Sequence, residues 1–163
     1  MTLQFTARTA FAALIVSFLF HNIEEAISIC SYPVQNPVSF IKPASCSQFL
    51  WAASLLTIVV IVFFIAALRI KKQTVNLLIS TAIASGLVLN VFIPHLLVAI
   101  YTLNYTPGLV TGVVLNLPLG LITLSKNSSL CKSRKQFYQY VIIGLIAGYL
   151  LFAGIMILVL HFI

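Results

Sequence analysis

The sequence is poor in charged residues, and acidic residues are the scarcest of all. Charged side chains make up 7% of the 163 residues and hydrophobic ones 61%, and the mean hydropathy is +1.14. Too little polar surface remains for water to surround such a chain, which excludes a soluble globular domain and a disordered one. The only acidic residues are the neighbours Glu24 and Glu25, which lie inside an apolar run.

The chain also lacks the long basic face that a nucleic-acid-binding domain needs. Its nine Lys and Arg residues give a net charge of +7, but they stand in short clusters between apolar stretches. A DNA- or RNA-binding protein would gather them along one face or helix. We therefore expect no nucleic-acid partner, and we interpret the clusters as topology signals of a protein whose main partner is the lipid bilayer.

Long apolar runs dominate the sequence. A hydrocarbon core of about 30 Å needs roughly 20 helical residues to cross it. Between residues 73 and 125 no residue is charged, and the one turn-like segment in this run is residues 104–108, which contains Pro107 and Gly108. Backbone groups in lipid must be satisfied within the segment, and no stretch alternates like a barrel strand. The sequence therefore predicts an all-α fold, a single transmembrane domain over residues 1–163 with five helices at about 9–31, 49–68, 73–101, 107–125 and 137–162.

The basic residues predict how these helices are oriented. The second and fourth connections hold seven of the nine, whereas the first holds only Lys42 and the third none. Lys and Arg are enriched in cytoplasmic loops. We therefore expect a multi-pass protein, in the plasma (inner) membrane, with a cytoplasmic N-terminus and an outer C-terminus. The seven residues are Arg69, Lys71, Lys72, Lys126, Lys132, Arg134 and Lys135.

The three cysteines divide between the two predicted sides. Cys30 and Cys46 bracket the first connection on the predicted outer side, where a disulfide can persist, and Cys131 falls in a predicted cytoplasmic loop, where thiols stay reduced. Cys30 and Cys46 are thus a candidate disulfide pair. Three free thiols remain the alternative.

A candidate site begins with the run His21-Asn22-Ile23-Glu24-Glu25. On a helix His21 shares a face with Glu24 at i+3 and with Glu25 at i+4, which is the spacing by which helices supply two metal ligands one turn apart. A carboxylate at membrane depth is costly, so it indicates a functional site by default. The alternative is that the helix ends early and the pair reaches water in the outer interface.

Polar residues of two further helices are predicted to reach the same depth. At 1.5 Å per residue, Asn90, His95 and Asn116 fall in the outer half with the first motif. An ideal helix would separate Asn90 from His95 by about 140°, but Pro94 clashes with the Asn90 carbonyl and kinks the helix. A common pocket, open to the outer side or outer leaflet, is therefore plausible. The alternative is an interfacial His95 beside an ordinary proline kink.

Together these elements resemble the HXXEE-domain integral membrane proteins. The resemblance rests on the His-x-x-Glu-Glu run, on the later asparagine and histidine, and on the segment 105–111 followed by Asn116 and Pro118. It covers the first four predicted helices, about residues 9–125. The family is suspected of forming an enzyme active site, with no reaction established for it as a class. The resemblance implies site residues His21, Glu24, Glu25, Asn90 and His95.

These residues suggest two kinds of chemistry. With a divalent metal such as zinc, His21, Glu25 and His95 would form a three-ligand site with a fourth position for water. The other glutamate would then serve as general base, and Asn90 would orient the substrate or a developing oxyanion. Without a metal, a glutamate and a histidine could move a proton within the substrate, as an isomerase or cyclase does.

The sequence thus favours a membrane-embedded enzyme that acts on a lipid-like molecule by metal-assisted hydrolysis or acid/base chemistry. One alternative is a transporter with a proton or metal-ion relay, but no inverted repeat is visible and the glutamate pair has no counterpart in the later helices. The other is a small accessory protein with a structural polar cluster, although Asn or Gln would join helices at lower cost. The oligomeric state is not indicated.

Overall fold

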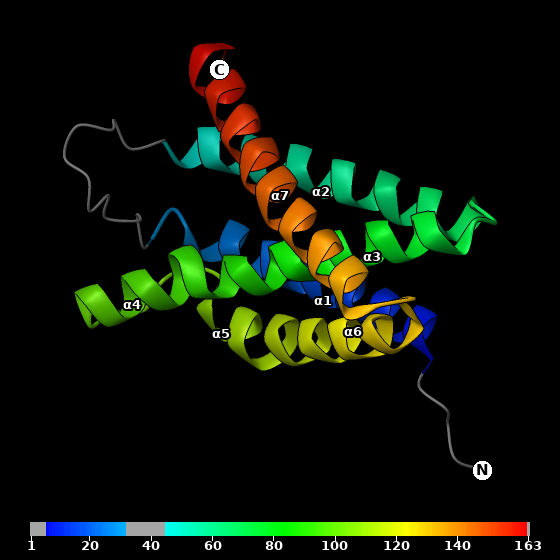
Figure 1. Cartoon of the computed structure of the whole chain (residues 1–163). Coiled ribbons are helices and arrows are strands. Elements are labelled where there is room, and N and C mark those ends of the chain that lie inside the picture. Colours follow the sequence, from blue (N-terminus) through cyan, green and yellow to red (C-terminus); the bar gives the residue numbers. More distant parts are fainter. Residues whose placement is uncertain (1–5, 32–44, 163) are drawn as a thin grey trace.

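The computed structural model describes residues 6–31 and 45–162, and every regular element in those ranges is helical. Five helical runs are long and apolar enough to cross a membrane (Figure 1). They are Ala7–Ser28, Cys46–Arg69, Gln73–Thr102, Leu109–Leu130 and Arg134–Phe162. The all-helical fold with five candidate spans is confirmed, as expected for a multi-pass integral membrane protein. The side of the membrane that each end faces stays a prediction.

Three of the five spans are single helices and two are composite. The single helices are α1 (Ala7–Ser28), α2 (Cys46–Arg69) and α7 (Arg134–Phe162). The third span joins α3 (Gln73–Asn90), the π-helical turn η1 (Val91–Leu96) and α4 (Leu97–Thr102). The fourth joins α5 (Leu109–Thr111), the π-helical turn η2 (Gly112–Asn116) and α6 (Leu117–Leu130). Short π-helical turns inside α-helices are frequent at functional sites.

Two helix ends differ from the predicted ones for identifiable reasons. Ser45 and Gln48 form a capping box, so α2 begins at Cys46, earlier than expected from hydropathy alone. Helix α6 continues to Leu130, and Lys126 therefore lies inside the helix instead of in the fourth connection. An apolar window locates the lipid-embedded part of a helix, but the hydrogen-bonded helix extends into the interface beyond it.

The core of the bundle lies where α1 packs between its neighbours. Phe11, Leu14 and Phe18 are buried on one side of α1 and pack with residues of α2 and α3. The rings of Phe11 and Phe64 meet edge to face with centroids 5.3 Å apart. Helix α7 crosses α3 and α2 at a steep angle, from the lower right to the top of Figure 1. Many apolar side chains on the outer faces of the helices are exposed, as suits contact with lipid.

The two ends of the bundle have different compositions. The start of α1, the α2–α3 turn and the α6–α7 connection lie together at the right-hand end of Figure 1, which gathers the basic clusters there. At the other end Cys30 and Cys46 are joined in a disulfide, with Cα atoms 5.3 Å apart. Cys131 is free. Lys42 lies outside the described residues.

Gly144 lies where α7 packs closely against α3. A Cβ atom at this position would meet the Ala82 backbone and the Ser85 hydroxyl, whereas a Cβ at Gly154, on the same helix, would meet nothing within 4 Å. We expect Gly144→Ala to lower the free energy of unfolding by about 1–3 kcal/mol through overpacking. Gly154→Ala should be neutral or stabilising by up to about 1 kcal/mol, because alanine favours a helix.

The measurement is thermal unfolding of the two variants in the same detergent, with the unchanged protein beside them. Equal unfolding midpoints for Gly144→Ala and Gly154→Ala would contradict the close contact between α3 and α7.

Candidate functional site

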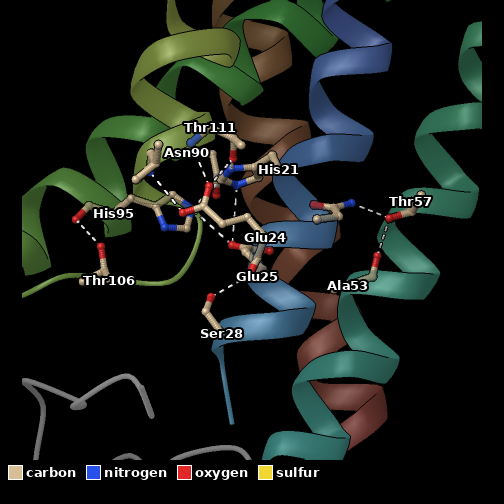
Figure 2. A network of polar contacts seen from close by, with 12 residues as sticks. His21, Glu24, Glu25, Ser28, Ala53, Thr57, Asn90, His95, Thr106 and Thr111 are labelled. Atoms are coloured by element: carbon tan, nitrogen blue, oxygen red, sulfur yellow. Dashed lines mark hydrogen bonds and ion pairs between the residues drawn. The ribbon is translucent and has the colours of Figure 1, made fainter. Parts of the chain in front are cut away.

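Three side chains from two spans converge inside the bundle, as Figure 2 shows. Nε2 of His21 and Nε2 of His95 lie 3.5 and 3.3 Å from the same oxygen, Oε1 of Glu25. One ligand atom from each residue lies within 4.8 Å of the others. All three are buried: His21 is 1% exposed, His95 4% and Glu25 8%. His21 and Glu25 are one turn apart on α1, so the helix itself sets half of this geometry.

The break in the third span places His95 beside the pair on α1. Ile93 has an extended backbone (φ −133°, ψ 111°) in the middle of η1, just before Pro94. Because of this break Asn90 and His95 are not turned away from each other, and the Asn90 amide nitrogen Nδ2 lies 3.1 Å from Nε2 of His95. The same Nδ2 lies 3.3 Å from Nε2 of His21. The kink inferred from Pro94 is confirmed.

The proton of His21 is located by a chain of hydrogen bonds. The Thr111 hydroxyl donates its single hydrogen to Oε2 of Glu24, at 2.5 Å. At the contact of 3.2 Å with Nδ1 of His21, this hydroxyl must therefore accept. Nδ1 of the neutral ring thus carries the hydrogen, and the lone pair of Nε2, which faces Glu25, accepts from the Asn90 amide.

The same reasoning applies to His95. Its ring hydrogen-bonds to the backbone of Pro107, whose only polar backbone group is a carbonyl, so the ring donates. A neutral imidazole has one N–H, which leaves Nε2 as the acceptor that faces Asn90 and Glu25. Two nitrogen lone pairs and a carboxylate oxygen thus point at one place. Such a set of acceptors fits a cation or a shared proton.

Gly108 closes over this cluster. Its backbone is left-handed (φ +82°), and a Cβ there would lie 2.6 Å from Cε1 of His21 and 2.9 Å from both Cγ of Glu25 and Cε1 of His95. Only glycine fits both the conformation and the space. The connection from Leu103 to Gly108 therefore passes directly over the cluster, and the Thr106 hydroxyl ties it to the His95 carbonyl at 3.0 Å.

Glu24 faces a different set of partners. Its carboxylate accepts from the backbone N–H groups of Val110 (3.2 Å) and Thr111 (2.7 Å), the second and third residues of the fourth span, and from the Thr111 hydroxyl. It also accepts from the Tyr105 hydroxyl at 2.6 Å. Burial and this hydrogen bond raise the pKa of Tyr105, so the phenol remains a donor. Glu24 thus caps a helix that has no side-chain cap of its own.

The structure therefore brings together four of the five expected residues and connects the fifth, Glu24, through Thr111. Asn116 belongs to a deeper layer, where the Ser17 hydroxyl donates to its Oδ1 at 2.6 Å. His161 is exposed in the last turn of α7. The individual roles of Thr111, Pro107 and Gly108 were not predicted, although their segment holds the one turn signal in the charge-free run.

The adjacent glutamates should differ in what they contribute to stability. We expect Glu24→Gln to lower the free energy of unfolding by about 1–3 kcal/mol, because an amide cannot accept from all four donors and leaves some unsatisfied. Glu25→Gln removes a buried carboxylate that contacts two ring nitrogens acting as acceptors, so no donor to it is lost and the effect should stay below about 1 kcal/mol.

The two variants make the same chemical change at adjacent positions, so each is the control for the other. The measurement is thermal unfolding in detergent with a chelator present, so that no bound ion contributes. A greater loss of stability for Glu25→Gln than for Glu24→Gln would contradict the capping role.

Comparisons with known proteins identify the family of this chain. Residues 12–123 match the family described as "Protein of unknown function with HXXEE motif"; the match begins within α1, ends within α6 and leaves α7 outside. The uncharacterized protein YrkK of Bacillus subtilis (strain 168) is 28% identical over 133 residues, which is 82% of each chain. No solved structure matches significantly. With the motif at His21, Glu24 and Glu25 inside the matched region, the chain belongs to the HXXEE family.

Proposed function

We propose that His21, Glu25 and His95 bind a divalent metal ion, zinc in the first place, as the centre of a membrane-embedded hydrolase. The observation that carries the proposal is the spacing of the ligand atoms. With zinc bonds of 2.0–2.1 Å, tetrahedral geometry separates neighbouring ligand atoms by about 3.3–3.4 Å. The two Nε2–Oε1 distances, 3.5 and 3.3 Å, are close to this value, and the three ligand atoms all lie within 4.8 Å of one another.

The kinds of ligand support the same ion. Two imidazoles and one carboxylate suit zinc and its neighbours among the transition metals, whereas Mg²⁺ and Ca²⁺ prefer sites built from oxygen. Three protein ligands are also the usual number in catalytic zinc sites, which keep a fourth position for water or substrate. The negative charge of Glu25, otherwise costly at membrane depth, would be offset by the ion.

The hydrogen bonds behind the ligands favour a metal as well. Ligating histidines usually donate their other N–H to a carboxylate or a backbone carbonyl, which sets the ring orientation. His95 donates to the Pro107 carbonyl, and His21 reaches Glu24 through Thr111. In this proposal Glu24 is a positioning residue. The Glu24 carboxylate already accepts four hydrogen bonds, so in this proposal it does not act as the general base expected at that position.

The remaining residues suggest how a substrate would be handled. A bound zinc ion would supply a polarised water for hydrolysis. The Asn90 amide nitrogen lies 3.3 and 3.1 Å from Nε2 of His21 and of His95, so it would lie beside a bound ion. In this orientation the nitrogen would donate to a developing oxyanion, and after a turn of 180° the oxygen would accept from a water. The substrate would be lipophilic, because the cluster is enclosed within lipid-facing helices.

A second candidate uses the same residues without a metal. Oε1 of Glu25 lies between two imidazole nitrogens, so a proton on Glu25 could pass to either ring. This arrangement would suit acid/base isomerisation or cyclisation of a lipophilic substrate. A proton or metal-ion transporter would use the same relay, and flux across liposomes would identify it.

Metal analysis distinguishes these candidates. We expect the full chain, purified in mild detergent, to bind about one zinc ion per chain, and Co²⁺ in its place to give the visible absorption of a tetrahedral site. His21→Ala, Glu25→Gln and His95→Ala should each weaken zinc binding by at least about tenfold, because three ligands are needed.

His161→Ala is the matched control, since this third histidine is exposed at the end of α7. Its zinc affinity should be unchanged. If the unchanged protein binds neither zinc nor cobalt at micromolar concentration, or if His161→Ala loses as much affinity as His95→Ala, the metal centre is wrong. The metal-free acid/base candidate would then remain.

A further inference from the structure

A second polar feature lies at the opposite end of the bundle and is independent of the proposed metal centre. It is a cavity of about 350 Å³ between α1, α2, α3 and α6. We propose that this cavity binds the phosphate-bearing head group of an anionic membrane lipid. Its charged and polar lining includes Arg8, Lys71, Gln73, Asn76, Ser80 and Asn127.

The charge of the lining points to an anion. Arg8 and Lys71 border the cavity, and neither has an ion pair within residues 6–31 and 45–162. The only acidic side chains of the sequence, Glu24 and Glu25, belong to the site at the other end of α1. No carboxylate side chain is therefore left to pair with the two cations. Basic pockets between transmembrane helices are the usual places where anionic head groups bind.

Asn76 adds a polar atom without a partner. Its Nδ2 donates to the Ile70 carbonyl at 2.8 Å, while its Oδ1 is buried and has no hydrogen-bond partner among the described residues. A buried acceptor of this kind calls for a donor from a ligand or water. The hydroxyl groups of a glycerol head group are such donors. Phosphatidylglycerol would thus meet both the cations and this acceptor.

The walls favour a lipid over a free phosphate ion. Phe11, Leu77 and Leu130 line the cavity beside the polar groups. Such mixed walls suit an amphipathic ligand whose head group lies among the polar atoms and whose chains follow the outer helix surface. A free phosphate would use the cations but would leave the apolar walls without a partner.

The test measures lipid binding to the full chain in neutral detergent by native mass spectrometry. Dioleoyl phosphatidylglycerol is compared with dioleoyl phosphatidylcholine, and inorganic phosphate is added as a competitor. We expect a preference for phosphatidylglycerol of about tenfold or more, which the double variant Arg8→Gln/Lys71→Gln should abolish. Gln73→Glu, at an exposed position on the rim, should weaken phosphatidylglycerol binding severalfold without disturbing the packing.

The double variant Lys132→Gln/Lys135→Gln is the matched control. It removes the same two charges from exposed positions that do not line the cavity. It should keep the lipid preference within about twofold. An equal loss in this control, or no preference in the unchanged protein, would overturn the proposal. Full displacement of the lipid by millimolar inorganic phosphate would also overturn it and would identify a site for the free anion.

Discussion

The hydrogen bonds between Glu24 and the start of the fourth span hold the candidate site together. A helix that begins inside a membrane protein exposes its first N–H groups where little water is present to satisfy them. Glu24, from α1, accepts two of these N–H groups and the Thr111 hydroxyl. This contact fixes the preceding loop as well, and with it the position of Gly108 over His21, Glu25 and His95.

The two neighbouring glutamates therefore have different surroundings for a simple geometric reason. Adjacent residues on a helix point about 100° apart. Glu25 turns toward His95 of the third span and also meets His21 of its own helix, whereas Glu24 turns toward the fourth span. Thr111 links the two environments, since its hydroxyl contacts both His21 and Glu24. The cap and the cluster thus form one connected network.

Irregular backbone accompanies this network. Both composite spans carry a π-helical turn at the level of the cluster, and the third span is broken at Ile93. Such departures from an α-helix are tolerated at membrane depth where neighbouring groups satisfy the freed backbone atoms. Here Thr106 supplies a donor to the His95 carbonyl next to the break. This hydrogen bond replaces part of the regular helical pattern that is lost at the break. The break in turn places His95 within contact distance of Asn90 and Glu25.

Much of this was accessible from the sequence. The length of the apolar runs determined the number of spans, because a bilayer has a fixed thickness and excludes unsatisfied backbone. The spacing of His21 and Glu25 on one helix determined that they would meet, and Pro94 indicated the kink beside His95. Only the tertiary structure decided that Glu24 caps another helix, that Gly108 covers the cluster, and that Arg8 and Lys71 share a cavity. These contacts join residues far apart in the chain, and no local periodicity encodes which faces of two helices will pack together.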